Sequence, residues 1–157
     1  MADERAAQPA SDQGDPIGVL QATPLRLAVL VETNSPSWLE EPYGPGKWRR
    51  REVIAHLADV ELAFSYRMRQ AAGEPGSRFV PFDQDVWASR NVRIDAGVAL
   101  EAFRALRALN LAWLSGLDLQ GWLSEGLHPA HGQQSIDDLV RYLAAHDLNH
   151  LEQLERV

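Results

Sequence analysis

Three histidines are the residues in this chain whose type and spacing are best suited to chemistry. His146 and His150 lie four residues apart in a segment with helical periodicity, so their side chains project from one face of a helix. That face is otherwise apolar, and His56 occupies the apolar face of an earlier helical segment. Imidazoles that are buried without partners cost free energy. A divalent ion shared by His56, His146 and His150 would satisfy all three, so the pattern predicts a metal site.

The composition narrows the chemistry of such a site. The chain contains no cysteine, so the ligands must be nitrogen or oxygen atoms. Imidazole binds zinc, nickel, iron and copper, and we expect zinc or nickel here. Three protein ligands leave coordination positions for water or substrate, which is typical of a catalytic site. The reactive group is then expected to be a metal-bound water with a pKa lowered to about 7.

Other polar residues near the histidines are candidates for supporting roles. Gln153 continues the face of His150, and Asp59 lies one turn after His56, so either could orient a ligand or a bound water. Asp147 is a further option, or it only solvates the edge of the face. His128 and His131 lie in an irregular stretch and are expected to be exposed. Either could reach the metal as a fourth ligand, but neither is counted in the site.

Four helical segments must position these side chains, and we predict no strand. The helices are expected near residues 24–34, 48–72, 95–117 and 135–155. Thr23 and Pro24 suggest the start of the first, and Ser135 with Asp138 suggests a capping box for the last. On the third helix, the residues expected to face inward are Phe103, Leu106, Asn110, Trp113 and Leu117.

The connections indicate the topology. Residues 74–91 contain two prolines and show no periodicity, which predicts a lid or a crossover of about 20 residues. A crossover would let the second and third helices run parallel. Residues 122–134 form a second irregular stretch. The fold class expected is therefore all-α: a single four-helix bundle domain over residues 16–157, preceded by a flexible tail at 1–15.

Bulk properties exclude several function classes. The formal net charge of −7 among 157 residues argues against a nucleic-acid-binding protein, which usually carries a basic face. No apolar run approaches the roughly 20 residues that cross a bilayer, and the N-terminal residues lack the apolar region of a signal peptide. The absence of cysteine fits a reducing cytoplasm, which is the location we expect.

Two histidine-containing segments carry a family resemblance. Residues 46–61, which include the Gly46-Lys47-Trp48 string and His56, resemble the second helix of the DinB/YfiT-like superfamily. Residues 146–153 are similar to that family's last helix, with the pattern H-D-x-x-H-x-x-Q. Residues 81–88 and 128–132 resemble one branch of the family. The resemblance extends from Leu20 to Val157.

The resemblance implies a bundle of up-down-down-up topology, usually dimeric, whose divalent metal is held by His56, His146 and His150. It also implies a homodimer here, for which apolar surface on the first and third helices could supply the interface. Known activities in the superfamily include thiol-dependent transfer and isomerisation as well as hydrolysis.

Three functional hypotheses follow. The first is a metal-dependent transferase or hydrolase that acts on a small molecule, with a low-molecular-weight thiol as a possible cosubstrate. The second is a non-catalytic, metal-binding or stress-associated bundle in which the histidines only hold the core together. The third, a helical interaction module without metal, does not account for three inward histidines.

One position departs from the family pattern. Many relatives have Ser or Thr after the Lys-Trp pair, whereas this chain has Arg49, followed by Arg50 and Arg51. Basic side chains at a helix N-terminus oppose the helix dipole. The triplet is either a solvated basic face or a clamp for an anionic substrate or thiol.

Overall fold

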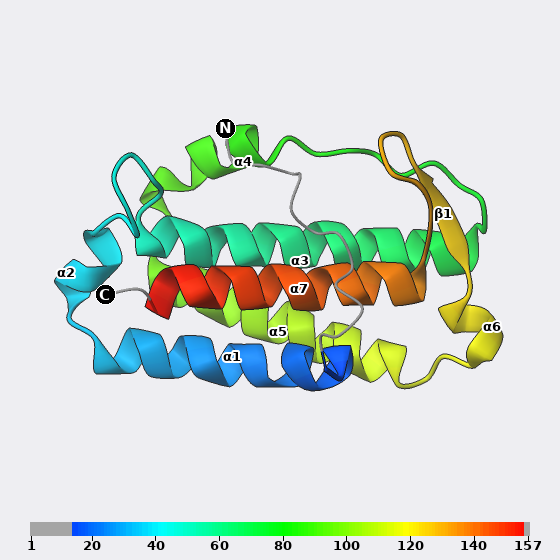
Figure 1. The fold of residues 1–157 in the computed structure, drawn as a ribbon, viewed down its shortest axis with the longest axis horizontal. Helices are drawn as coiled ribbons and strands as arrows, with labels where there is room; N and C mark the ends of the chain where they lie inside the picture. The colour runs from blue at the N-terminus through cyan, green and yellow to red at the C-terminus, as the bar shows by residue number, and fades with distance from the viewer. Residues whose placement is uncertain (1–13, 156–157) are drawn as a thin grey trace.

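Four long helices form the molecule in the computed structural model, which describes residues 14–155. They are α1 (Pro16–Thr33), α3 (Arg50–Gly73), α5 (Ala96–Leu114) and α7 (Ile136–Glu155). Figure 1 shows α3 and α5 running in one direction and α1 and α7 in the other. The all-α bundle with up-down-down-up topology is therefore confirmed.

The crossover between α3 and α5 makes this topology possible. Figure 1 shows the chain returning along the bundle from the end of α3 to the start of α5. The segment contains α4 (Gln84–Arg90) and a 3₁₀ turn, η1 (Asn91–Arg93). The Asp83 carboxylate accepts hydrogen bonds from the N–H groups of Asp85 and Val86, which starts α4. Two further short helices, α2 (Pro36–Glu40) and α6 (Leu119–Trp122), lie in the other connections.

A β-hairpin corrects the prediction that the chain has no strand. Strand β1 (Glu125–His128) pairs antiparallel with β2 (Gly132–Ser135), and Leu127 lies opposite Gln133. Each strand has only four residues, and the sequences EGLH and GQQS lack the alternation of apolar and polar residues that marks a strand. The crossover adds to the hairpin, because the Phe79 N–H donates to the Leu127 carbonyl at 2.9 Å.

The first helix begins earlier than predicted. The Asp15 carboxylate accepts from the Ile17 N–H at 3.1 Å, and Pro16 occupies the first helical position, so α1 starts there and not at Thr23. Pro24 lies inside the helix and has no N–H to offer the Leu20 carbonyl. That carbonyl accepts instead from the Arg107 guanidinium at 2.9 Å. The predicted tail at 1–15 falls almost wholly outside the described residues.

The N-termini of α3 and α7 are fixed by local hydrogen bonds. The predicted capping box of α7 is confirmed, because the Asp138 carboxylate accepts from the Ser135 N–H and the Asp138 N–H donates to the Ser135 hydroxyl. In α3, the Glu52 carboxylate accepts from the Arg49 N–H at 2.7 Å even without a Ser or Thr cap.

The arginine triplet at the start of α3 binds acidic residues of the α2 region. The Glu40 carboxylate pairs with both Arg49 and Arg51, and Glu41 lies 3.6 Å from the buried Arg50. The Arg51 guanidinium also donates to the Val92 carbonyl of η1 at 2.7 Å. The triplet therefore fastens α2 and η1 to α3, which neither of the two interpretations from sequence anticipated.

The apolar core is divided in two along the bundle. One cluster surrounds Phe64, Met68 and Leu143, and the other surrounds Ile54, Phe103 and Leu151. Between them lies a layer of buried polar side chains from all four long helices. Its members are Thr23, His56, Glu61, Arg107, Asn110, Asp147 and His150.

Exposed apolar side chains lie on the two helices that were expected to form a homodimer interface. Leu25 on α1 and Val98 on α5 expose 70% and 65% of their surface, so apolar side chains do lie outward on the two helices named for an interface. The homodimer itself stays a prediction, which light scattering at micromolar concentration would test. Among the described residues, no helix is both long and apolar enough to cross a membrane.

Candidate metal centre

The three predicted ligands meet in the polar layer. His56 comes from α3, and His146 and His150 come from successive turns of α7. The Nε2 atom of His146 lies 3.1 Å from Nε2 of His56 and 3.1 Å from Nε2 of His150. Two nitrogens that bind one ion at about 2.0–2.1 Å lie roughly 3.0–3.4 Å apart. The spacing of the imidazoles therefore fits a shared ion.

The imidazoles are held in the neutral form that ligates metals. Burial, with the nearby His150, lowers the pKa of His56 to about 3, and burial lowers the pKa of His150 to about 4. The pKa of His146 is also lowered well below its usual value by burial and by the charges of the other two histidines. All three rings are therefore neutral near pH 7.

Gln153 fixes which nitrogen of His150 faces the cluster. The Nδ1 atom of His150 lies 2.8 Å from the Gln153 amide oxygen, which can only accept, so Nδ1 carries the hydrogen. The lone pair of His150 Nε2 then points at Nε2 of His146. That atom lies 3.1 Å from Nε2 of His150 and also 3.1 Å from Nε2 of His56. One N–H cannot donate well to both neighbours, whereas a cation satisfies all three lone pairs. The donor set fits a divalent metal.

Gln153→Ala should weaken metal binding by about 10–100-fold, because loss of such an outer partner frees the ligand ring to rotate. Competition with a chromophoric chelator measures the affinity. Asn149→Ala is the matched control, since Asn149 is exposed on the same helix. Equal affinities for the Gln153→Ala protein and wild type would contradict this role.

Asp59, the other predicted supporting residue, has a different partner. Its carboxylate accepts a hydrogen bond from the Asn91 side chain of η1. Burial raises the pKa of Asp59, and the hydrogen bond from Asn91 opposes that rise. Asp59 therefore attaches the crossover to α3, close in sequence to His56.

A buried ion-pair network adjoins the histidines and was not predicted. The Arg107 guanidinium on α5 donates to Asp147 on α7 at 2.7 Å and to Glu61 on α3 at 2.8 Å. With its bond to the Leu20 carbonyl, this single side chain joins all four long helices. Burial lowers the pKa of Arg107, but the charges of Asp147 and Glu61 outweigh it and raise the pKa. The Asp147 side chain belongs to this network and does not solvate an edge.

The network fixes the helices that carry the ligands. Asp147 directly follows His146, and Glu61 lies on α3 a little over one turn beyond His56. The Glu61 carboxylate also accepts from the Asn110 amide at 2.7 Å. Because Arg107 binds both acids, it sets the spacing of α3 and α7 beside the histidine cluster.

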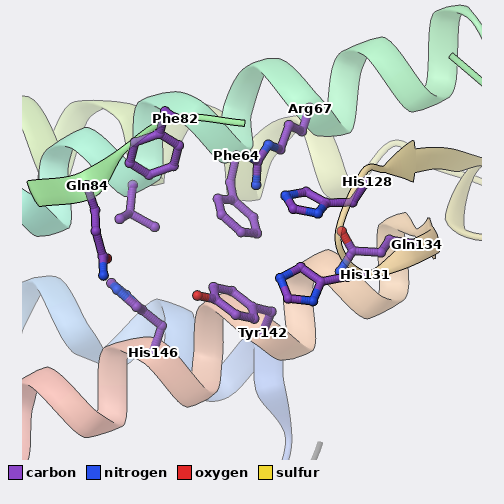
Figure 2. A pocket seen from close by; sticks show the side chains of 10 residues that line it. Phe64, Arg67, Phe82, Gln84, His128, His131, Gln134, Tyr142 and His146 are labelled. Carbon is purple, nitrogen blue, oxygen red and sulfur yellow. The ribbon is translucent and has the colours of Figure 1, made fainter. Parts of the chain in front are cut away.

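A pocket opens beside the histidine cluster. His146 keeps part of its surface exposed and lines this pocket, whereas His56 and His150 are buried. Figure 2 shows the walls: Phe64 and Arg67 from α3, Phe82 and Gln84 from the crossover, and Tyr142 from α7. The cluster is thus accessible from this pocket, which is shaped by residues of the predicted crossover and of the hairpin; among these, Phe82, Gln84 and Gln134 were not named as site residues from sequence.

His128 and His131 line the same pocket. Their rings stack at 4.5 Å, with His128 buried in β1 and His131 exposed, so the expectation of exposure is right for only one of them. The group of described residues that could hold an ion contains His56, His146 and His150 only.

The metal-free protein should lose stability as the pH falls from about 6.5 toward about 4. An unfolded imidazole protonates near 6.5, whereas the buried pKa values of His56 and His150 are about 3 and about 4. The unfolded state therefore binds more protons in this window. Each histidine then lowers the free energy of unfolding by up to about 1.4 kcal/mol for each unit by which the pH falls within this window.

Thermal melts with a chelator at pH of about 7, 6 and 5 measure this loss. His56→Gln should flatten the pH dependence, and the exposed His131→Gln should leave it unchanged. Equal melting temperatures at pH of about 7 and 5 would show that the rings are not buried in neutral form.

Comparison with known proteins identifies the family. The family model described as DinB superfamily matches residues 20–154, which is most of the chain. The chain belongs to the DinB superfamily. This confirms the resemblance carried by the two histidine segments.

Individual DinB relatives agree in sequence and fold. The chain is 33% identical over 72 residues to "Putative metal-dependent hydrolase YfiT" of Bacillus subtilis, a match that spans 46% of the chain and only 40% of that protein. It is 27% identical over 134 residues to OB0413 of Oceanobacillus iheyensis, which carries the same description, covering 83% of the chain and 76% of the relative. The solved structure of YfiT, which is described as having an unusual four-helix bundle topology, superposes on this chain with a TM-score of 0.79 at 26% sequence identity. That match covers 90% of this chain and 84% of YfiT.

Proposed function

We propose that the chain is a metal-dependent hydrolase that acts on a small molecule at His56, His146 and His150. The observation that carries the proposal is the partial exposure of His146 toward a pocket, which gives the histidine cluster one open side. A metal site that only held the core together would need no such opening. The names of YfiT and OB0413, which describe metal-dependent hydrolases, support the same reaction class.

The residues of the chain have separable roles in this reaction. A divalent ion held by the three imidazoles would polarise the substrate and lower the pKa of water to about 7. Gln153 keeps the His150 ring oriented, and Arg107 holds α3 and α7 at the required spacing. Phe64 and Tyr142, whose rings stack at 5.1 Å, form an apolar wall that excludes water from the bound substrate.

Metal reconstitution tests the proposal. Chelator-treated protein would be loaded with zinc or nickel and assayed on a panel of small esters, amides, lactones and phosphoesters. We expect turnover only in the loaded protein and none in His150→Ala. Two results together would favour the non-catalytic alternative. The protein would bind one ion per chain but hydrolyse none of these compounds, and the absorption spectrum of its cobalt-substituted form would not change when azide is added as a ligand.

The thiol-dependent transfer expected from the resemblance stays a prediction. A low-molecular-weight thiol that binds the ion should change the visible absorption of the cobalt-substituted protein. An unchanged spectrum at millimolar thiol would count against a thiol cosubstrate.

A further inference from the structure

We propose that Trp48 is a positioning residue of the metal centre, and that its indole ring holds the His56 ring in the orientation that binds the ion. The inference rests on the metal site of the proposed function and deepens it. It gives His56 an outer partner, as Gln153 is the outer partner of His150. The inference concerns the binding of the metal and not the hydrolytic step.

His56 lacks the kind of partner that orients His150. The Nδ1 atom of His150 is fixed by the Gln153 amide oxygen at 2.8 Å. Among the described residues, the side chain of His56 has a hydrogen-bonding contact only at Nε2, with Nε2 of His146. A ligand ring without a hydrogen bond on its other nitrogen is oriented by what packs against it.

The ring of Trp48 packs against that of His56. The ring centres are 5.0 Å apart and the planes are inclined by 59°. Aromatic rings attract each other in tilted arrangements with centres about 4.5–7 Å apart. Metal binding would place part of the positive charge of the ion on the imidazole, and indole is the side chain that stabilises a nearby cation best. Trp48 therefore favours both the orientation and the metal-bound form of His56.

The burial of both rings leaves His56 little room to turn. His56 is 1% exposed, and Trp48 packs against the core cluster that contains Ile54 and Leu151. Interiors of this kind are close-packed, so a buried ring keeps one orientation as long as its neighbours stay in place. Removal of the indole would open space beside the ligand.

The loop between α2 and α3 fixes the backbone of Trp48. Figure 1 shows this loop at one end of the bundle, beside the start of α3. The Trp48 carbonyl accepts from the Tyr43 N–H at 3.2 Å, and the Arg50 N–H donates to the Glu41 carbonyl at 3.1 Å. The two arms of the loop are therefore paired. The ion pairs of the arginine triplet with Glu40 and Glu41 hold the same loop, so the triplet supports the metal centre through Trp48.

Trp48 and the pocket lie on different sides of His56 along the chain. Trp48 precedes α3, whereas the α3 residues that line the pocket all follow His56; they are Val60, Phe64 and Arg67. Trp48 is not part of the lining. Its substitution should therefore change the affinity for the metal without changing the walls of the pocket.

Competition of the full chain with a chromophoric chelator for zinc tests the role of Trp48. Trp48→Leu keeps an apolar side chain but removes the ring, and it should weaken zinc binding about five- to tenfold. Trp48→Phe keeps a ring and should weaken it by less than about threefold. A residue that only fills space in the core would lose stability in both variants without a loss of zinc affinity.

Trp38→Leu is the matched control. Trp38 is partly buried against the same core cluster, and its ring contacts the Arg50 guanidinium at 5.1 Å. The substitution should lower the melting temperature, as Trp48→Leu does, but it should leave the zinc affinity nearly unchanged. An equal loss of affinity in the two leucine variants would show that stability alone explains the effect.

Tryptophan fluorescence gives a second measurement. Cobalt bound beside Trp48 should quench its emission, whereas zinc has a filled d shell and should not. The chain contains five tryptophans, so the contribution of Trp48 is found by comparison of wild type with Trp48→Phe. We expect cobalt to quench a smaller part of the emission in Trp48→Phe. Equal fractional quenching in both proteins would show that Trp48 does not lie beside the ion.

Other outcomes would overturn the inference directly. One is a folded Trp48→Leu protein that binds zinc as tightly as wild type. If Trp48→Leu does not fold, the zinc affinities of Trp48→Phe and Trp38→Phe and the cobalt quenching decide the question. A loss of affinity in Trp48→Phe but not in Trp38→Phe would support the role of Trp48, and equal affinities would contradict it.

The experiment separates this inference from the proposed hydrolase. A protein that loses zinc affinity in Trp48→Leu but hydrolyses none of the tested compounds would refute the hydrolase alone. An active hydrolase whose Trp48→Leu form binds zinc as tightly as wild type would refute the positioning role alone. A wild-type protein that binds neither zinc nor cobalt would refute both.

Discussion

Arg107→Met should lower the free energy of unfolding by about 3–5 kcal/mol, because it leaves two buried acids without their cation. Glu61 and Asp147 are each 1% exposed, and the Arg107 guanidinium lies within 3 Å of both carboxylates. The change also removes the donor to the Leu20 carbonyl, which Pro24 leaves without an intrahelical partner. Urea denaturation, followed by circular dichroism, measures the loss.

Two variants sharpen this prediction. Arg104→Met breaks an exposed ion pair with Glu101 on the same helix and should cost less than about 1 kcal/mol. Adding Glu61→Gln to Arg107→Met should restore part of the stability, because it removes one unpaired charge while its amide oxygen can still accept from Asn110. A loss below about 1 kcal/mol in Arg107→Met would show that the network does not brace the bundle.

The histidine trio could be predicted because its signal is local and strong. The four-residue spacing of His146 and His150 on an apolar face determines that the rings share a side of one helix. The capping residues of α7 and the long proline-containing crossover were equally visible. The topology needed more than periodicity, and it came from the resemblance of the two histidine segments to the DinB family.

The supporting structure around the trio could not be predicted in the same way. On α5 the buried positions include Phe103, Arg107, Asn110 and Leu114, whereas Leu106 and Trp113 were expected inward and are only partly buried. A hydrophobicity pattern places an arginine outward, and only the two acids on other helices make its burial favourable. The hairpin was missed for a related reason, since its short strands are held by pairing with a distant segment at Phe79.

His56→Ala and His150→Ala should each remove most of the bound metal. Each change leaves only two imidazoles to bind the ion. The fall in metal affinity should therefore be larger than the fall of about 10–100-fold that is expected when an outer partner such as Gln153 is lost. Affinity in the wild-type protein should also fall as protons compete for the ligands in acid. His131→Ala is the control, because His131 lies in the pocket wall outside the ligand group.

Elemental analysis of untagged protein, dialysed after exposure to zinc or nickel, tests the central claim most directly. The three-histidine centre predicts one ion per chain in wild type and in His131→Ala, and almost none in His56→Ala or His150→Ala. If both of the latter proteins fold and retain one ion per chain, His56, His146 and His150 do not form the metal centre.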